Sequence, residues 1–243
     1  MDMKLLYFRR GLLLFVLAAG MVPVSAVGQS KVGTTAAQFL GIPVGGRAVA
    51  MGGAYVASNQ DVSSIYWNPG AIVQADRSEF SFVNTDWLVG TKFRWFGLLL
   101  NFDGENAIGA SVTQLDYGSE DVTTVTNPEG TGEQWSAADL AVALSYSRRL
   151  TDKFSIGGSA KFINQRIWNE SATAITFDVG LLFVTDFNGM RIGMSMSNFG
   201  GDLTLSGKDL LNRVDIDPNN AGSNKTLVAD LKTDAWPMPL LFR

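Results

Sequence analysis

Residues 191–197 read Arg191-Ile-Gly-Met-Ser-Met-Ser197, so apolar side chains alternate there with small or polar ones. An alternation with a period of two predicts a β-strand that is apolar on one face only. The same pattern recurs, clearly or more weakly, in residues 78–86, 92–102, 106–117, 137–147, 154–165 and 173–184. The sequence therefore predicts an all-β chain of seven strands, followed by the opening of an eighth in residues 236–243.

The face opposite the apolar side chains indicates where these strands lie. In residues 137–147 and 173–184 it consists mainly of Ser, Gly, Ala and Thr, whereas soluble exteriors favour Lys, Glu and Arg. Each run is close to the length of about 9–11 residues that a tilted membrane strand needs. We therefore expect an antiparallel transmembrane β-barrel whose apolar face meets lipid. A soluble β-sandwich with the apolar face as its core is the alternative.

The connections distinguish two ends of the predicted sheet. End B receives short turns, including an Asn188-Gly189 hairpin signal, and end A receives two long loops, residues 118–132 and 200–234. Outer-membrane barrels have long external loops, short periplasmic turns and aromatic girdles, so end A is the predicted outside. The predicted girdle at end A consists of Trp87, Trp95, Trp135, Trp168 and Trp236.

Missing residue types limit the chemistry of the chain. It contains no cysteine and no histidine, which excludes a histidine-dependent catalytic triad, a thiolate nucleophile and a zinc site of Cys or His. We therefore expect no enzyme, no cofactor and no metal. The formal net charge of −4 argues against a nucleic-acid partner, because such proteins carry a basic stripe.

The N-terminal quarter of the chain does not alternate. Basic residues precede an apolar run and the small-residue site Val24-Ser-Ala26, so residues 1–26 are a predicted Sec-type signal peptide. Residues 27–75 would enter the barrel from end B and form a hatch, or plug, with short helices. Residues 76–243 would supply the barrel strands.

One motif in this segment carries a family resemblance. Residues 46–57 read Gly46-Arg-Ala-Val-Ala-Met-Gly-Gly-Ala-Tyr-Val-Ala57, and Asp61 and Trp67-Asn-Pro-Gly70 follow. This run resembles the N-terminal signature of the PorV/PorQ family, within the larger group of FadL-like β-barrels. The family commonly has Asn-Pro-Ala where this chain has Asn68-Pro-Gly70.

The resemblance implies a bacterial outer-membrane barrel of about 14 strands, within the range known for such barrels. The seven or eight strands expected here would then be its N-terminal portion, with the barrel incomplete at the C-terminus. Two functions follow from the resemblance. One is an accessory role in type IX protein secretion, with a secretion translocon and secreted cargo proteins as partners. The other is a FadL-like passive transporter of hydrophobic small molecules; a purely structural barrel is a third possibility.

The candidate site residues fall in the hatch motif and on the barrel wall. The hatch residues are Gly46, Arg47, Met51, Gly52, Gly53, Asp61, Trp67, Asn68 and Pro69. Arg47 lies among small apolar residues, so we expect it to be buried with Asp61 as its partner, either as a structural lock or as a gating contact. Asp61 is the predicted N-cap of one helical turn.

Lys161 and Asp178 both face the predicted lumen. A two-residue loop at Asn169-Glu170 would place them directly opposite each other, which predicts a cross-strand ion pair. This pair is either ordinary wall structure or a polar gate that contacts the hatch.

Overall fold

The computed structural model describes residues 35–58, 61–213 and 228–243, all within one compact unit. The predicted signal peptide of residues 1–26 and the start of the predicted hatch lie outside these residues. No helix in the described part of the chain is long and apolar enough to cross a membrane.

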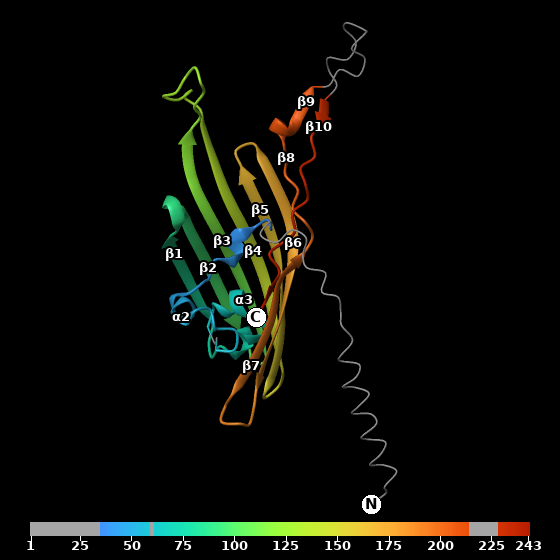
Figure 1. The fold of residues 1–243 in the computed structure, drawn as a ribbon. Coiled ribbons are helices and arrows are strands. Elements are labelled where there is room, and N and C mark those ends of the chain that lie inside the picture. The colour runs from blue at the N-terminus through green and yellow to red at the C-terminus, as the bar shows by residue number, and fades with distance from the viewer. Residues whose placement is uncertain (1–34, 59–60, 214–227) are drawn as a thin grey trace, which may run out of the picture. The chain divides into compact units, whose positions relative to one another are not determined.

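Seven long strands form one sheet in which each strand is antiparallel to the next along the chain (Figure 1). They are β1 (Glu79–Asp86), β2 (Lys92–Asn101), β3 (Asn106–Asp121), β4 (Gln134–Thr151), β5 (Phe154–Ile167), β6 (Glu170–Val184) and β7 (Arg191–Gly200). The predicted all-β antiparallel fold is confirmed. The short strands β11 (Leu241–Phe242) and β8 (Ser206–Gly207) pair with β7 and β6. Within the described residues β1 and β11 are the edges, so the sheet is not closed.

The two faces of the sheet are inverted relative to a soluble protein. On β4 the apolar Leu144 is 64% exposed, whereas its neighbour Ser145 is 2% exposed. Exposed apolar side chains continue across the strands on this outer face, while Ser and Thr side chains are buried on the inner face. The outer apolar stretch of β4 runs from Ala138 to Tyr146, which spans about 19–22 Å along the membrane normal for a tilted strand. That length is close to the apolar band, about 25 Å tall, of an outer-membrane barrel.

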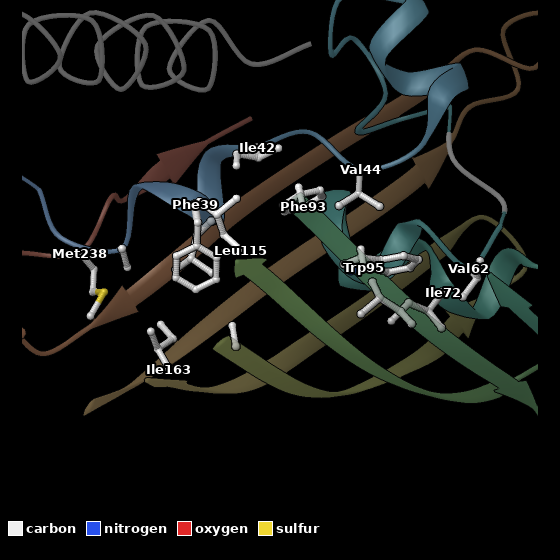
Figure 2. Packing of buried hydrophobic residues seen from close by; sticks show 14 of the residues in the cluster. Phe39, Ile42, Val44, Val62, Ile72, Phe93, Trp95, Leu115, Ile163 and Met238 are labelled. Atoms are coloured by element: carbon white, nitrogen blue, oxygen red, sulfur yellow. The ribbon is translucent and has the colours of Figure 1, made fainter. Parts of the chain in front are cut away.

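Residues 35–58 and 61–75, which together we call the inner segment, lie on the inner face of the sheet. Their helices are η1 (Gln38–Gly41), α2 (Gly46–Ala50), α3 (Ser64–Trp67) and η2 (Pro69–Gln74). Figure 2 shows Phe39, Ile42 and Val44 of this segment in one buried cluster with wall side chains such as Phe93 and Ile163. The helix η2 contacts β3, β4, β5 and β6, so the inner segment crosses much of the sheet.

The hairpin between β3 and β4 is longer than expected. Pairing shifts register between Asp116 and Ser119 and then resumes, because Gly118 adopts a φ of 82° that accommodates the irregularity. The predicted loop of residues 118–132 is therefore wrong at its start, since β3 continues to Asp121. The turn that does connect the strands spans residues 122–133.

The connection from β7 to β11 folds back on itself. Leu203 and Trp236 form an antiparallel bridge, and β9 (Leu211–Arg213) pairs with β10 (Val228–Asp230) beyond it. The 3-10 turn η4 (Lys208–Leu210) precedes β9, and η3 (Leu88–Gly90) joins β1 to β2. The predicted strand of residues 236–243 is shorter than expected, because its two prolines cannot donate a ladder hydrogen bond.

Candidate functional site

Asn68 is the centre of contact between the inner segment and the wall. It takes an extended conformation after α3, as expected for a residue that precedes proline. Its fully buried side chain donates from Nδ2 to the carbonyl oxygens of Val56 and Leu181, at 2.9 Å each. Its Oδ1 accepts from the Gly70 amide at 3.0 Å. Asn68 therefore joins two parts of the inner segment to β6.

Serines of the wall donate hydrogen bonds to carbonyl groups at the end of α3 and at the start of η2. Short helices leave such carbonyls without internal partners. Ser195 donates to the Trp67 carbonyl at 2.9 Å, and Ser155 and Ser147 donate to the Gly70 carbonyl at 2.7 and 3.2 Å. These serines come from β7, β5 and β4, so three strands bind one stretch of four residues, Trp67 to Gly70.

Two further wall side chains extend this contact toward end B. Arg149 of β4 donates to the Val73 carbonyl at 3.3 Å, and Asn101 of β2 donates to the Ala75 carbonyl at 2.6 Å. The end of η2 is therefore hydrogen bonded across the wall as well.

Glycines of the wall let the inner segment approach the strands this closely. A Cβ atom at Gly180 would collide with Asn68 Oδ1, and one at Gly193 would lie 2.6 Å from the Val56 carbonyl oxygen. A Cβ at Gly109 would lie 2.7 Å from Ile65 Cγ1. A Cβ atom at Gly157 would likewise collide with the Pro69 carbonyl oxygen. Real Cβ atoms are not found at such distances, so these positions require glycine while their present neighbours are in place.

Sequence reasoning recognised these glycines and serines only as one small, polar face of the strands. The available signal was their spacing of two residues, as in Ser155 and Gly157. That spacing indicated a crowded or watery wall but not which segment it contacts. The partners lie far away along the chain, for example 85 residues between Ser155 and Gly70.

The tryptophan of the motif anchors the first half of the inner segment. Trp67 is buried and donates from Nε1 to the Val44 carbonyl at 2.8 Å. Gly52 and Gly53 adopt φ values of 65° and 82°, and the Trp67 ring lies 3.5 Å from the position of a Gly53 Cβ. The Tyr55 ring packs edge-on against Trp67 with centroids 6.2 Å apart.

Asp61 organises the turn before α3. Its Oδ1 accepts from the Ser63 amide at 2.9 Å, and Ser63 is the residue at the N-cap position. Asp61 therefore makes the capping hydrogen bond expected of it, but α3 itself begins only at Ser64. Its Oδ2 accepts from the Tyr55 hydroxyl at 2.7 Å. Burial, and then this hydrogen bond to Asp61, raises the pKa of the Tyr55 phenol, so Tyr55 remains a neutral donor.

Arg47 is not buried and forms no ion pair with Asp61 in the described residues, which corrects the expectation for this residue. The helix α2 turns Ala48 inward against Tyr55 and Trp67. Gly46, Arg47 and Met51 are exposed, and Arg47 lines an open pocket together with Asp61 and with Glu79 of β1.

Lys161 and Asp178 contact each other, with Nζ 2.7 Å from Oδ2, and both are buried. They are diagonal neighbours, because the register pairs Lys161 with Thr176 and Asp178 with Ser159. The expected direct opposition is wrong, since Trp168 adopts a φ of 52° and occupies the first turn position itself. Lys161 also donates to Asn198 Oδ1 at 2.8 Å.

The tryptophans of the predicted girdle do not share one environment. Trp95 is buried on the inner face beside Ile72 and Val62, so its assignment to an exposed girdle is wrong (Figure 2). The alternation of β2 places residue 95 on the inner face, where its ring also covers Gly97. Trp135, Trp168 and Trp236 are exposed, and Trp87 packs partly against the core. Their contact with a membrane interface stays a prediction.

The arrangement forms a tight interface between the inner segment and the wall. The space between the inner segment and the wall near Tyr66 and Lys161 measures about 20 Å³, enough for about one water molecule. In residues 35–58, 61–213 and 228–243 no group of three or more acidic residues is placed to hold a metal ion.

Comparison with known proteins identifies one family. A family model described as type IX secretion system protein PorV matches residues 25–208, which is about three quarters of the chain. The match includes the inner segment and the strands from β1 to β7. No curated protein matches the chain.

Proposed function

The chain belongs to the PorV family of outer-membrane proteins of the type IX secretion system, and we propose that it acts there as an accessory partner component. Its partners in this role are the secretion translocon and secreted cargo proteins. Its outer face contacts outer-membrane lipid. In this proposal residues 1–26 direct export, residues 27–75 are the hatch, and residues 76–243 supply wall strands.

The observation that carries the proposal is the bound state of the inner segment. Residues 64–75 use hydrogen bonds to β2, β4, β5, β6 and β7, and the cavity beside α3, near Tyr66 and Lys161, holds only about one water molecule. A conduit would require this segment to leave or to make room. A partner component has no such requirement, because it acts through its surface.

The surface that we assign to partners lies at end A. The β3–β4 hairpin ends in residues 122–133, whose turn is held by backbone hydrogen bonds such as that from Thr131 to Val122 at 2.8 Å. Val125 at its tip is fully exposed. The connection from β7 to β11 is the second part of this surface.

Replacing residues 122–133 with an Asn-Gly turn tests the proposal, since Asp121 and Gln134 remain paired at the base of the hairpin. We expect the tagged wild-type chain to retain the translocon or secreted proteins during purification in detergent, and the shortened variant to lose them. The matched control carries Asp103→Ser and Glu105→Ser in the end-B turn and should retain them. Retention of the same partners by the shortened variant would contradict the assignment of end A.

One observation favours the alternative function, a passive transporter of hydrophobic small molecules. An apolar cavity of about 170 Å³ lies near end A between Ile167, Ala172, Leu203, Leu205 and Trp236. It has room for an alkyl branch or a single ring. Uptake of a fluorescent fatty acid by liposomes that contain the protein, lost in Ala172→Trp, would support transport. Uptake equal to that of empty liposomes would exclude it.

A further inference from the structure

Asn198 is a buried residue with an unusual backbone. Its φ is 65°, in the left-handed region that favours glycine, and it is 1% exposed. Two residues of β7, Ser197 and Asn198, face the single residue Asp178 of β6, because the pairing shifts between Phe177 and Val179. This is a β-bulge, a feature that bends a strand and redirects the chain that follows it.

Side chains from three strands converge on this bulge. Asp178 Oδ1 accepts from the Asn198 amide at 2.8 Å, and Lys161 Nζ donates to Asn198 Oδ1 at 2.8 Å. Lys161 and Asp178 also form the buried ion pair described above. A buried ion pair adds little net stability, because desolvation offsets the attraction, and its best-attested use is to specify one arrangement.

Asn198 also reaches the chain where it returns from end A. Its Nδ2 donates to the Pro239 carbonyl at 3.1 Å. Pro239 follows the stem of the β7–β11 connection, which we define as the paired residues 203–205 and 233–236. One side chain therefore links the strand that leaves toward end A with the strand that comes back.

We propose that the Lys161–Asp178–Asn198 cluster positions this stem, and through it the part of the partner surface that the connection presents. The inference rests on the proposed function for the meaning of that surface, but the positioning itself is a property of the fold. In this account Lys161 and Asp178 fix the orientation of Asn198. Asn198, at the end of β7, then holds the returning chain at Pro239, so that the two segments that lead into and out of the stem stay together. All three are positioning residues that do not contact the partner.

The substitution Asn198→Gly separates positioning from folding. Glycine adopts the same φ without strain and keeps the amide that donates to Asp178, but it removes the bonds to Lys161 and Pro239. Asn188→Gly is the matched control, because Asn188 also has a positive φ, 51°, in the end-B turn. Asn188→Gly is expected to melt as the wild type does, whereas Asn198→Gly, which loses two hydrogen bonds of a buried side chain, is expected to fold and to melt somewhat lower.

Hydrogen exchange at the bridge amides of Leu203 and Trp236 reports on the stem, since each donates to the other's carbonyl at 2.8 and 2.9 Å. We expect Asn198→Gly to accelerate their exchange about tenfold, equivalent to about 1.4 kcal/mol of local stability. Asn188→Gly should leave it unchanged. Wild-type exchange in Asn198→Gly would overturn the inference.

The amount of translocon or cargo that co-purifies with each variant is the second readout. It would not change if the cluster served only to stabilise the fold. At a temperature where both variants are fully folded, Asn198→Gly should retain less translocon or cargo than Asn188→Gly. Equal capture by both variants would overturn the link between the cluster and the surface. If the wild-type chain itself captures no partner, the proposed function fails, and the exchange measurement still decides whether the cluster positions the stem.

Discussion

Asn68 makes the contacts on which the binding of the inner segment depends most. Replacing it with alanine removes three hydrogen bonds of a fully buried side chain and leaves the carbonyls of Val56 and Leu181 without these donors. We expect Asn68→Ala to lower the free energy of unfolding by about 2–4 kcal/mol. Urea unfolding in detergent, followed by tryptophan fluorescence, measures this. Asn84→Ala, at an exposed position of β1, is the control and should change it by less than about 0.5 kcal/mol.

Gly180 tests the close approach from the side of the wall. A methyl group there would collide with Asn68 Oδ1 and lie 2.9 Å from the Gly70 amide. We expect Gly180→Ala to cost about 1–3 kcal/mol and to make the inner segment susceptible to protease. Gly201→Ala meets open space and should behave as the wild type. Unchanged protection of the segment in Gly180→Ala would contradict the close packing.

Individual residues could be predicted from sequence where a local rule determines them. The residue before Pro69 had to be extended, and Asn68 is. The environment of Arg47 could not be predicted, because it depends on the way α2 turns Ala48 toward Trp67. The serine donors could not be predicted either, because their acceptors become neighbours only after the inner segment binds.

The strands were predictable because alternation follows directly from one-sided burial. Errors concentrate where a single residue changes the local geometry. Trp168 occupies a turn position and moves the β5–β6 register, and Gly118 lets β3 continue beyond its expected end. Both residues have a positive φ, which residues other than glycine seldom adopt. The alternation of apolar and polar side chains gives no information about φ.

The helices α3 and η2 are expected to stay bound to the wall while the protein works. The chain has no cysteine, so a designed disulfide has no competitor. Ile65 Cγ1 lies 2.7 Å from the position of a Gly109 Cβ, which places the two Cβ atoms near the separation of about 4 Å that a disulfide requires. We expect Ile65→Cys with Gly109→Cys to cross-link and to retain its partners when oxidised. Loss of partners on oxidation that reduction restores would show that the segment must move.

The molecule as a whole is a wall with an apolar outside and an inner face occupied by its own N-terminal segment. Val142 lies in the middle of the apolar stretch of β4, and Leu150 lies near its end-B limit; both are exposed. Arginine in the bilayer midplane costs about 2–4 kcal/mol, falling to about 0–1 near the interface. We therefore expect Val142→Arg to destabilise the protein in liposomes far more than Leu150→Arg. Equal small effects would argue against burial of this face in lipid.

Spin labels on single cysteines along residues 142–146 test the inverted wall most directly. Labels on the exposed Val142, Leu144 and Tyr146 should be relaxed by oxygen, which dissolves in lipid, and not by a water-soluble nickel chelate. Labels on the buried Ala143 and Ser145 should be immobile, and neither oxygen nor the nickel chelate should relax them. An alternation of this kind in bilayers is the predicted result. Access of the nickel chelate to Val142 and Leu144 would contradict it.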